Sequence, residues 1–138
     1  MVVLKTSMRY LMAVLFVAAG ANHFINPDFY IQIMPTYLPF PRALVLLSGL
    51  TEIAGGVMLC FRKTAVVGAW SIVAMLVVFF LVHIDMIIHA DRYPSMPMWG
   101  LVLRLLLQFL LIAWACWFTR PVSNAAATIF DRQAKQEQ

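Results

Sequence analysis

Charged residues are scarce in this chain, and their scarcity excludes an ordinary soluble domain. Only 12% of its 138 residues are Asp, Glu, Lys or Arg, whereas 63% are hydrophobic, and the mean hydropathy is +0.86. A globule of this length would leave much of its surface in water. The ten Lys and Arg residues stand singly or in pairs between long apolar runs, which is typical of membrane flanks. We therefore expect contact with membrane lipid and no nucleic-acid partner.

Cysteine is also scarce. The chain has only Cys60 and Cys116, and it has no CxxC motif. Two distant cysteines exclude a disulfide framework, and the missing CxxC excludes thiol exchange at a dithiol site. We interpret both side chains as small apolar packing residues.

What the chain does contain is four apolar runs, each close to the roughly 20 residues that a helix needs to cross a bilayer. Polar or proline-containing stretches separate them. The runs cover residues 8–25, 44–61, 65–88 and 99–118. We predict an all-α fold, an integral membrane four-helix bundle within residues 1–120, followed by a polar cytoplasmic tail over residues 121–138.

The first run allows a second interpretation. Lys5 and Arg9 precede an apolar stretch that ends in small residues at positions 18–21, as in a cleavable signal peptide. Cleavage would leave three spans and no soluble domain. We favour an uncleaved first helix.

The distribution of Lys and Arg predicts that both termini lie in the cytoplasm, an N-in/C-in orientation. Seven of these cations then fall on the cytoplasmic side, namely Lys5, Arg9, Arg62, Lys63, Arg120, Arg132 and Lys135. Three fall toward the other side, namely Arg42, Arg92 and Arg104. We expect the inner (plasma) membrane of a bacterium, with the first and third connections outside.

The first connection is long, and it is rich in proline and aromatic residues. It covers residues 27–41. Aromatic side chains favour the depth of the lipid headgroups. We predict an interfacial segment that lies over the outer mouth of the bundle.

Small residues follow one face of the second run. At spacings of three and four this face carries Ser48, Gly49, Glu52, Gly55, Gly56 and Leu59. Ala19 and Gly20 could supply a matching surface in the first run. Small residues let helix backbones approach closely, so we predict tight packing between these helices.

Polar side chains at membrane depth are costly and often mark function. All four runs carry them toward the predicted outer half of the bilayer, which predicts one shared cavity there. The candidate ligand-binding residues are His23, Glu52, His83, Asp85, Arg104 and Gln108. We predict an ion pair between Glu52 and Arg104, because a lone charge at that depth would cost several kcal/mol.

Each candidate also has a structural interpretation. Gln108 is more typical of a hydrogen bond between helices than of a ligand contact, and His83 and Asp85 could serve in the same way. The Glu52–Arg104 pair could hold the bundle together instead of binding a substrate. Histidine and carboxylate ligands scattered singly over three helices lack the spacing of a metal motif, so we expect no metal site.

Two stretches resemble DoxX-type membrane proteins, in order and spacing. These are AGANHFINPDFY at residues 19–30 and LSGLTEIAGG at residues 47–56, and the resemblance extends over about residues 8–118. It implies a four-helix membrane subunit. Some such proteins are tied to thiosulfate or sulfide oxidation that feeds electrons to quinone, others to redox homeostasis or to assembly of a partner enzyme. It also implies that His23, Glu52 and Arg104 are recurring polar positions. The third run departs from the family pattern at His83-Ile84-Asp85.

These observations leave three functions open. The first is an accessory or scaffold subunit of a membrane redox system that docks a partner redox enzyme. The second is an oxidoreductase subunit whose outer cavity binds a quinone or a small sulfur compound. The third is a small proton-coupled transporter with Glu52 as the carrier site. We expect no covalently bound cofactor; catalysis and oligomeric state stay undecided.

Overall fold

The computed structural model describes residues 2–94 and 96–120, and the predicted tail lies outside these residues. Within them the chain is helical and has no strand. Its elements are α1 (Val2–Ile25), α2 (Pro27–Gln32), α3 (Pro41–Cys60), α4 (Ala65–Ile88), the 3₁₀ turn η1 (Ala90–Arg92) and α5 (Met98–Phe118). The structure confirms the predicted all-α fold. The four long helices are each long and apolar enough to cross a membrane, which is compatible with a small integral membrane protein.

Prolines mark the starts of two long helices, α3 and α5, and both helices begin before the apolar runs that predicted them. Pro41 occupies the first turn of α3, where its missing N–H costs nothing, so α3 begins three residues before the apolar run. Phe40 before it is in the left-handed region, with φ of 52°. Pro97 precedes α5 in an extended conformation. The helix α1 extends back to Val2, beyond the apolar run that begins at residue 8.

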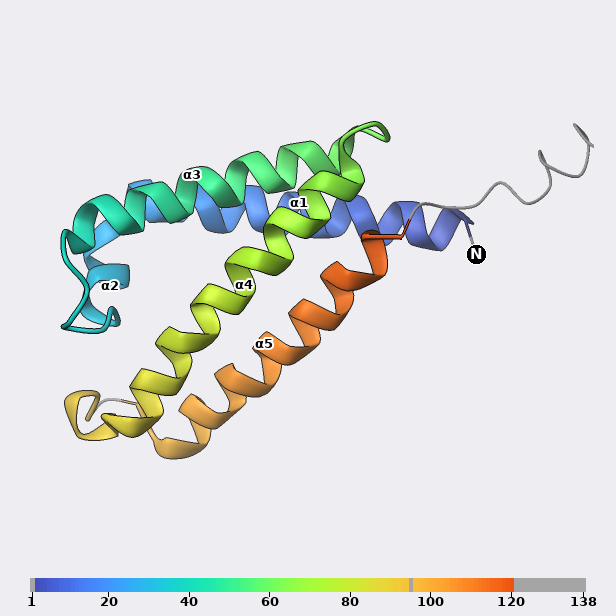
Figure 1. The fold of residues 1–138 in the computed structure, drawn as a ribbon. Coiled ribbons are helices and arrows are strands. Elements are labelled where there is room, and N and C mark those ends of the chain that lie inside the picture. The colour runs from blue at the N-terminus through green and yellow to red at the C-terminus, as the bar shows by residue number, and fades with distance from the viewer. Residues whose placement is uncertain (1, 95, 121–138) are drawn as a thin grey trace, which may run out of the picture.

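The long helices form two pairs that meet at one end and separate at the other. Figure 1 shows α1 beside α3 and α4 beside α5, with the pairs converging where α3 turns into α4. They diverge toward the end that holds α2 and η1. We call the end with the turn between α3 and α4, residues 61–64, the basic end. We call the end with α2 and η1 the cavity end.

Glycines bring α1 against α3, as the sequence predicted. A Cβ atom placed on Gly49 would lie 2.6 Å from the Cβ of His23, and one on Gly20 would lie 2.6 Å from the carbonyl oxygen of Gly49. Both distances are too short for real carbon atoms, so a side chain at either position would force the helices apart. Gly56 packs in the same way against the backbone of Ala13.

A second glycine contact joins α3 to α4 near the basic end. A Cβ atom on Gly68 would lie 2.7 Å from the Cβ of Met58 and 2.9 Å from the carbonyl oxygen of Gly55. Around it lies a closely packed apolar core. That core consists of Met12, Ala13, Phe16, Leu59, Ala69, Ile72, Val73, Met75, Leu76, Ala115 and Phe118.

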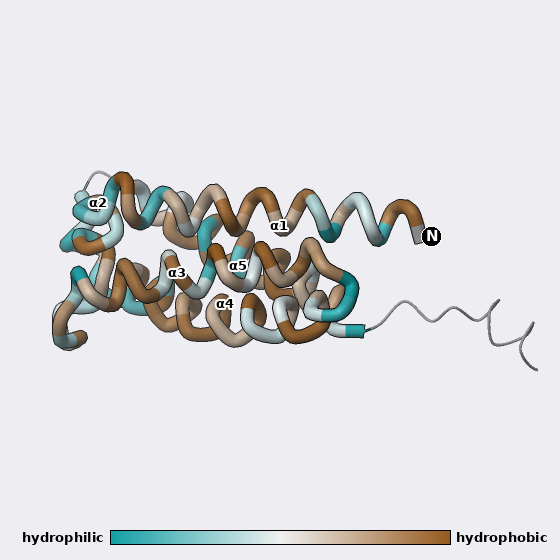
Figure 2. Tube along the Cα trace, turned by 90° about the horizontal axis from the view of Figure 1, so that it is seen from above, coloured by the Kyte–Doolittle hydropathy of each residue, from teal (hydrophilic) through white to brown (hydrophobic). Residues whose placement is uncertain are grey.

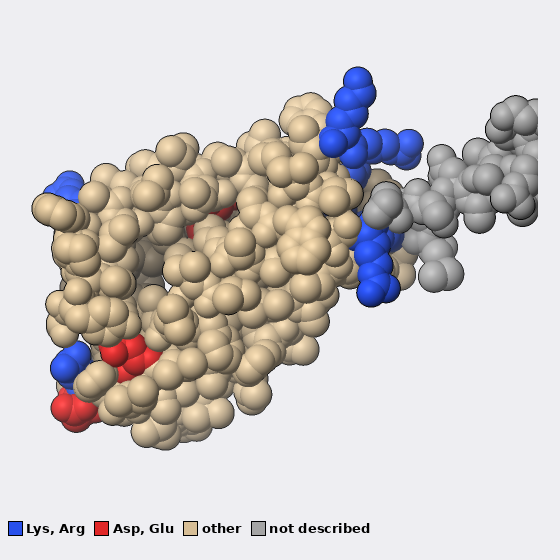
Figure 3. All heavy atoms as spheres, viewed as in Figure 1, with Lys and Arg blue, Asp and Glu red and all other residues tan. Residues whose placement is uncertain are grey.

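Charge separates the two ends. Apolar positions predominate along the long helices in Figure 2, and hydrophilic positions gather toward their ends. At the basic end, the described residues carry Lys5, Arg9, Arg62, Lys63 and Arg120. The described acidic residues Asp28, Glu52, Asp85 and Asp91 all belong to the other half. Figure 3 shows one face, where Lys and Arg atoms cluster at one end, while the other half carries the Asp and Glu atoms together with further Lys or Arg atoms. Arg42 and Arg92 belong to that half, so only the basic end carries a single sign of charge among the described residues.

Candidate functional site

The cavity end contains a cavity of about 190 Å³. Residues from all five α-helices line it, and α2 with the residues after it forms its outer wall. Figure 3 shows the hollow on this face, with acidic atoms visible at its floor. The lining residues are Ala19, His23, Tyr30, Ile33, Met34, Val45, Ser48, Glu52, Phe79, Val82, His83 and Arg104.

One pole of the cavity is built around His23, which is 4% exposed. Its Nδ1 lies 3.0 Å from the carbonyl oxygen of Val45 and 2.9 Å from Oγ of Ser48. Because a carbonyl oxygen can only accept, Nδ1 must carry a hydrogen and donate it. The Ser48 hydroxyl donates its own hydrogen to the same carbonyl, at 2.8 Å. The backbone of α3 therefore fixes the orientation of the ring and turns Nε2 toward Glu52.

Glu52 faces that nitrogen from the next turn of α3. Its Oε2 lies 3.6 Å from Nε2 of His23, which is beyond hydrogen-bond distance. The same oxygen is buried and has no hydrogen-bond partner in the described part of the chain. With Nδ1 of His23 already protonated, one further proton can reside on either Nε2 or the carboxyl group. The two residues together form a proton-holding pair with one carboxyl oxygen left for a third group.

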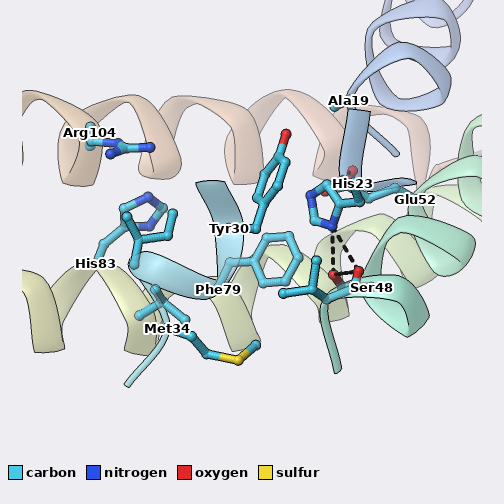
Figure 4. A pocket seen from close by; sticks show the side chains of 12 residues that line it. Ala19, His23, Tyr30, Met34, Ser48, Glu52, Phe79, His83 and Arg104 are labelled. Carbon is cyan, nitrogen blue, oxygen red and sulfur yellow. Dashed lines mark hydrogen bonds and ion pairs between the residues drawn. The ribbon is translucent and has the colours of Figure 1, made fainter. Parts of the chain in front are cut away.

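Arg104 and His83 form the opposite pole (Figure 4). Nη1 of Arg104 lies 3.6 Å from Sδ of Met96, a weak acceptor. Within residues 2–94 and 96–120, no carboxylate forms an ion pair with Arg104. Nδ1 of His83 is likewise buried with no partner among those residues.

The predicted ion pair between Glu52 and Arg104 is therefore wrong. Glu52 pairs with His23 instead. The cause is the close approach of α1 to α3 at Gly20 and Gly49, which brings His23 over Glu52. Arg104 comes from α5, across the cavity, and its guanidinium stays on the far wall (Figure 4).

Two aromatic side chains, Tyr30 and Phe79, lie between the poles (Figure 4). The ring centroid of Tyr30 lies 3.7 Å from that of His23, and its hydroxyl accepts a hydrogen bond from Asn22 at 2.9 Å. Neither residue, nor Ser48, was predicted from the sequence as a ligand contact. Ser48 could have been predicted, because it lies four residues before Glu52 and therefore on the same face of α3.

Asp85 and Gln108 do not line this cavity. Nε2 of Gln108 donates to the carbonyl oxygen of Leu76 at 2.6 Å, so Gln108 links α5 to α4. Asp85 is 7% exposed and lies 3.1 Å from Nδ1 of His89, one turn further along α4. Burial, and then the charge of Asp85, raise the pKa of Tyr93 just beyond the helix, while Arg92 opposes the shift. The structure thus brings four of the six candidates together and separates these two.

Comparison with known proteins gives a family and no activity. Residues 12–119 match the family described as a domain of unknown function, DUF8561. The chain belongs to this family. No curated protein and no solved structure matches it.

The match to DUF8561 includes every residue of the cavity, but it leaves out the part of α1 before residue 12. Among the described residues, no three His, Cys, Asp or Glu side chains are grouped to hold a metal ion. The cavity instead offers a cation on one wall, a proton-holding pair on the other, and aromatic faces between them. Such a site can bind a flat, uncharged ring with an acceptor at each end, and exchange a proton with one of them.

Proposed function

We propose that this protein binds the head group of a quinone in its cavity, as a subunit of a membrane redox system. The observation that carries the proposal is the arrangement of two polar poles around two aromatic rings (Figure 4). A quinone head group is a flat ring with carbonyl oxygens at opposite edges. Arg104 would donate to one carbonyl, and the His23–Glu52 pair would face the other.

The size of the cavity supports a single ring. A cavity of about 150 Å³ in another protein holds benzene, so the 190 Å³ here fits a ring with small substituents. Tyr30 and Phe79 offer their faces and edges to such a ring. Two buried polar atoms lack a partner among the described residues, Oε2 of Glu52 and Nδ1 of His83. Each can donate to a quinone oxygen when it carries a hydrogen.

The charges of the lining favour a quinone over a small sulfur anion such as thiosulfate. Arg104 is the only Lys or Arg among the lining residues, and Glu52 opposes it across the cavity. A doubly charged anion would lose its hydration shell against mostly apolar and aromatic walls, which is costly without several donors. An uncharged ring loses little.

Each residue then has a distinct role. A bound quinone supplies the acceptor of two electrons. Arg104 orients it through a charge-assisted hydrogen bond, and Ser48 with the Val45 carbonyl fixes the His23 ring. Reduction of a quinone by two electrons takes up two protons. The His23–Glu52 pair would supply the proton for one oxygen, and water entering the cavity would supply the other. The electrons would come from a partner redox enzyme, as the DoxX resemblance implies.

A scaffold role remains the second candidate, supported by the close glycine contacts of α1 with α3. These contacts make a rigid pair against which a partner enzyme could dock. The ion pair expected to hold such a scaffold is not formed, and its two members face a cavity instead. We therefore rank quinone binding first.

Titration of a short-chain quinone into the detergent-purified protein tests the proposal, with quenching of tryptophan and tyrosine fluorescence as the readout. We expect saturable binding that weakens about 10- to 100-fold in Arg104→Leu, since a hydrogen bond from a charged group contributes about 1.5–3 kcal/mol. Arg62→Gln, at the basic end, removes the same charge far from the cavity and should bind like the unaltered chain. No saturation by folded protein, or equal binding by both variants, would leave the scaffold role in front.

A further inference from the structure

Two cations of the basic end, Lys5 and Arg9, form a small site beside the end of α5, which we call the niche. Lys5 and Arg9 lie one turn apart on α1 and so share a face. Nζ of Lys5 donates to the backbone carbonyl of Arg120, at the end of α5, at 2.8 Å. It also lies 5.9 Å from the centre of the Trp117 ring. These contacts hold the Lys5 ammonium in the seam between α1 and α5.

Both cations keep unused donors. An ammonium group has three N–H donors, and the Arg120 carbonyl takes one from Lys5. The guanidinium of Arg9 rests 5.2 Å from the Tyr10 ring centre, and its Nε is buried without a hydrogen-bond partner in the described chain. No described Asp or Glu lies at this end to neutralise them. The niche thus presents several charged donors and, among residues 2–94 and 96–120, no acid.

The surface beside these donors is apolar. Leu4, Leu11 and Trp117 are each exposed by more than two fifths. In a chain built to span a membrane, this surface meets acyl chains. A ligand matching the site therefore has a phosphate for the cations and hydrocarbon for the helices beside them.

The geometry points to a binding site for an anionic phospholipid, with its phosphate held by Lys5 and Arg9 and its acyl chains along the α1–α5 seam. Trp117 would lie at the level of the lipid glycerol, where indole rings are favoured. Basic niches between membrane helices are a known means of holding anionic headgroups. The site is separate from the cavity and does not depend on quinone binding.

Native mass spectrometry of the full chain in a neutral detergent tests this site. Such a detergent has no charged bilayer surface, so only lipid held by the protein is counted. We expect phosphatidylglycerol to bind at least tenfold more tightly than phosphatidylcholine. Because the two cations would bind the phosphate through charge-assisted hydrogen bonds, Lys5→Gln with Arg9→Gln should weaken phosphatidylglycerol binding by at least about tenfold.

The matched control removes the same charge from the same end of the molecule. Arg62 and Lys63 are exposed in the turn between α3 and α4, and Arg62→Gln with Lys63→Gln should weaken binding less than fivefold. Equal losses in the two double variants would overturn the niche in favour of diffuse charge. A variant that keeps a cation at each of the two positions, Lys5→Arg with Arg9→Lys, should retain binding within about threefold. Circular dichroism verifies its helix content.

Two further results would also overturn the inference. Equal affinity for phosphatidylglycerol and phosphatidylcholine would show that the cations do not select a charged headgroup. Displacement of the lipid by millimolar glycerol phosphate would identify a site for soluble phosphates instead. Persistence of phosphatidylglycerol binding at that concentration is the expected result, because the acyl chains contribute to affinity.

Discussion

The two ends of the bundle use the same four helices in opposite ways. At the basic end, small residues such as Gly56, Gly68 and Ala115 let the helices meet, and the core is apolar and closely packed. At the cavity end the helix pairs diverge, and the space between them holds His23, Glu52 and Arg104 (Figure 1). The comparison shows how a small membrane protein can place polar groups at bilayer depth. One end stabilises the bundle, and the other is free to keep unpaired polar atoms.

The largest effect should come from Gly49, which sets the contact of α1 with α3 beside the cavity. In Gly49→Ala the new Cβ atom would lie 2.8 Å from the Gly20 carbonyl oxygen, and backbone cannot give way as a side chain does. We expect a loss of about 2–3 kcal/mol in unfolding free energy, near the upper range for overpacking. Denaturant unfolding in detergent micelles measures it.

Gly100→Ala is the matched control for this substitution. A Cβ atom there would approach nothing closer than Pro97 at 3.8 Å. Alanine is also the better helix former by about 1 kcal/mol, so this variant should be as stable as the unaltered chain or more so. Equal destabilisation by both substitutions would contradict the close approach of α1 to α3.

Replacing valine by phenylalanine at two positions on α4 would test whether one end is closely packed and the other contains free space. Val73 is 8% exposed in the core, whereas Val82 lines the cavity. We expect Val73→Phe to cost about 1–3 kcal/mol, because the core has no room for the ring. Val82→Phe should cost less than about 1 kcal/mol, as the ring enters existing space.

Ligand binding should reverse the order of these two variants. Val82→Phe would fill the space assigned to the quinone ring and abolish its binding, while Val73→Phe in folded protein should retain it. Fluorescence titration on both variants decides the matter. A Val82→Phe protein that binds quinone normally would remove the cavity from the proposed function.

The sequence was sufficient to predict the four helices and the contact between α1 and α3, because hydropathy and small residues act locally or along one helix face. It also selected His23, Glu52, His83 and Arg104, which do meet in one cavity. Residues two positions apart lie on different sides of a helix, so His83 and Asp85 do not share a face of α4. Which of those sides faces the cavity depends on the rotation of α4 in the bundle.

The partner of Glu52 could not be predicted from the sequence, because it too depends on how the helices are rotated in the bundle. Charge alone favours Arg104, the only Lys or Arg deep within a predicted span. The close approach of two glycines, however, fixes the rotation of α1 on α3 and places His23 3.6 Å away. A contact between helices depends on such rotations, which no single helix encodes.

A smaller effect is expected at the support of His23. Ser48→Ala removes the hydroxyl that accepts from Nδ1, while the Val45 carbonyl still holds the ring. We expect a loss of about 1 kcal/mol in stability, the usual value for one hydrogen bond. Nitrogen NMR of labelled histidine should still show the hydrogen on Nδ1. Its transfer to Nε2 would contradict the geometry proposed for the proton-holding pair.

The smallest effect should be at the outermost contact between the diverging helix pairs. Nη1 of Arg92, in η1, donates to Oγ1 of Thr36, in the segment after α2, at 3.4 Å, and both residues are accessible to solvent. A long, exposed hydrogen bond contributes little, so Arg92→Gln should change the unfolding free energy by less than about 0.5 kcal/mol. If this contact closes the cavity end, however, quinone should dissociate faster from the variant, and stopped-flow fluorescence measures that rate. Unchanged dissociation would mean that the contact between Arg92 and Thr36 does not hold the helix pairs together. The outer wall would then be kept in place by α2, whose Tyr30 accepts a hydrogen bond from Asn22.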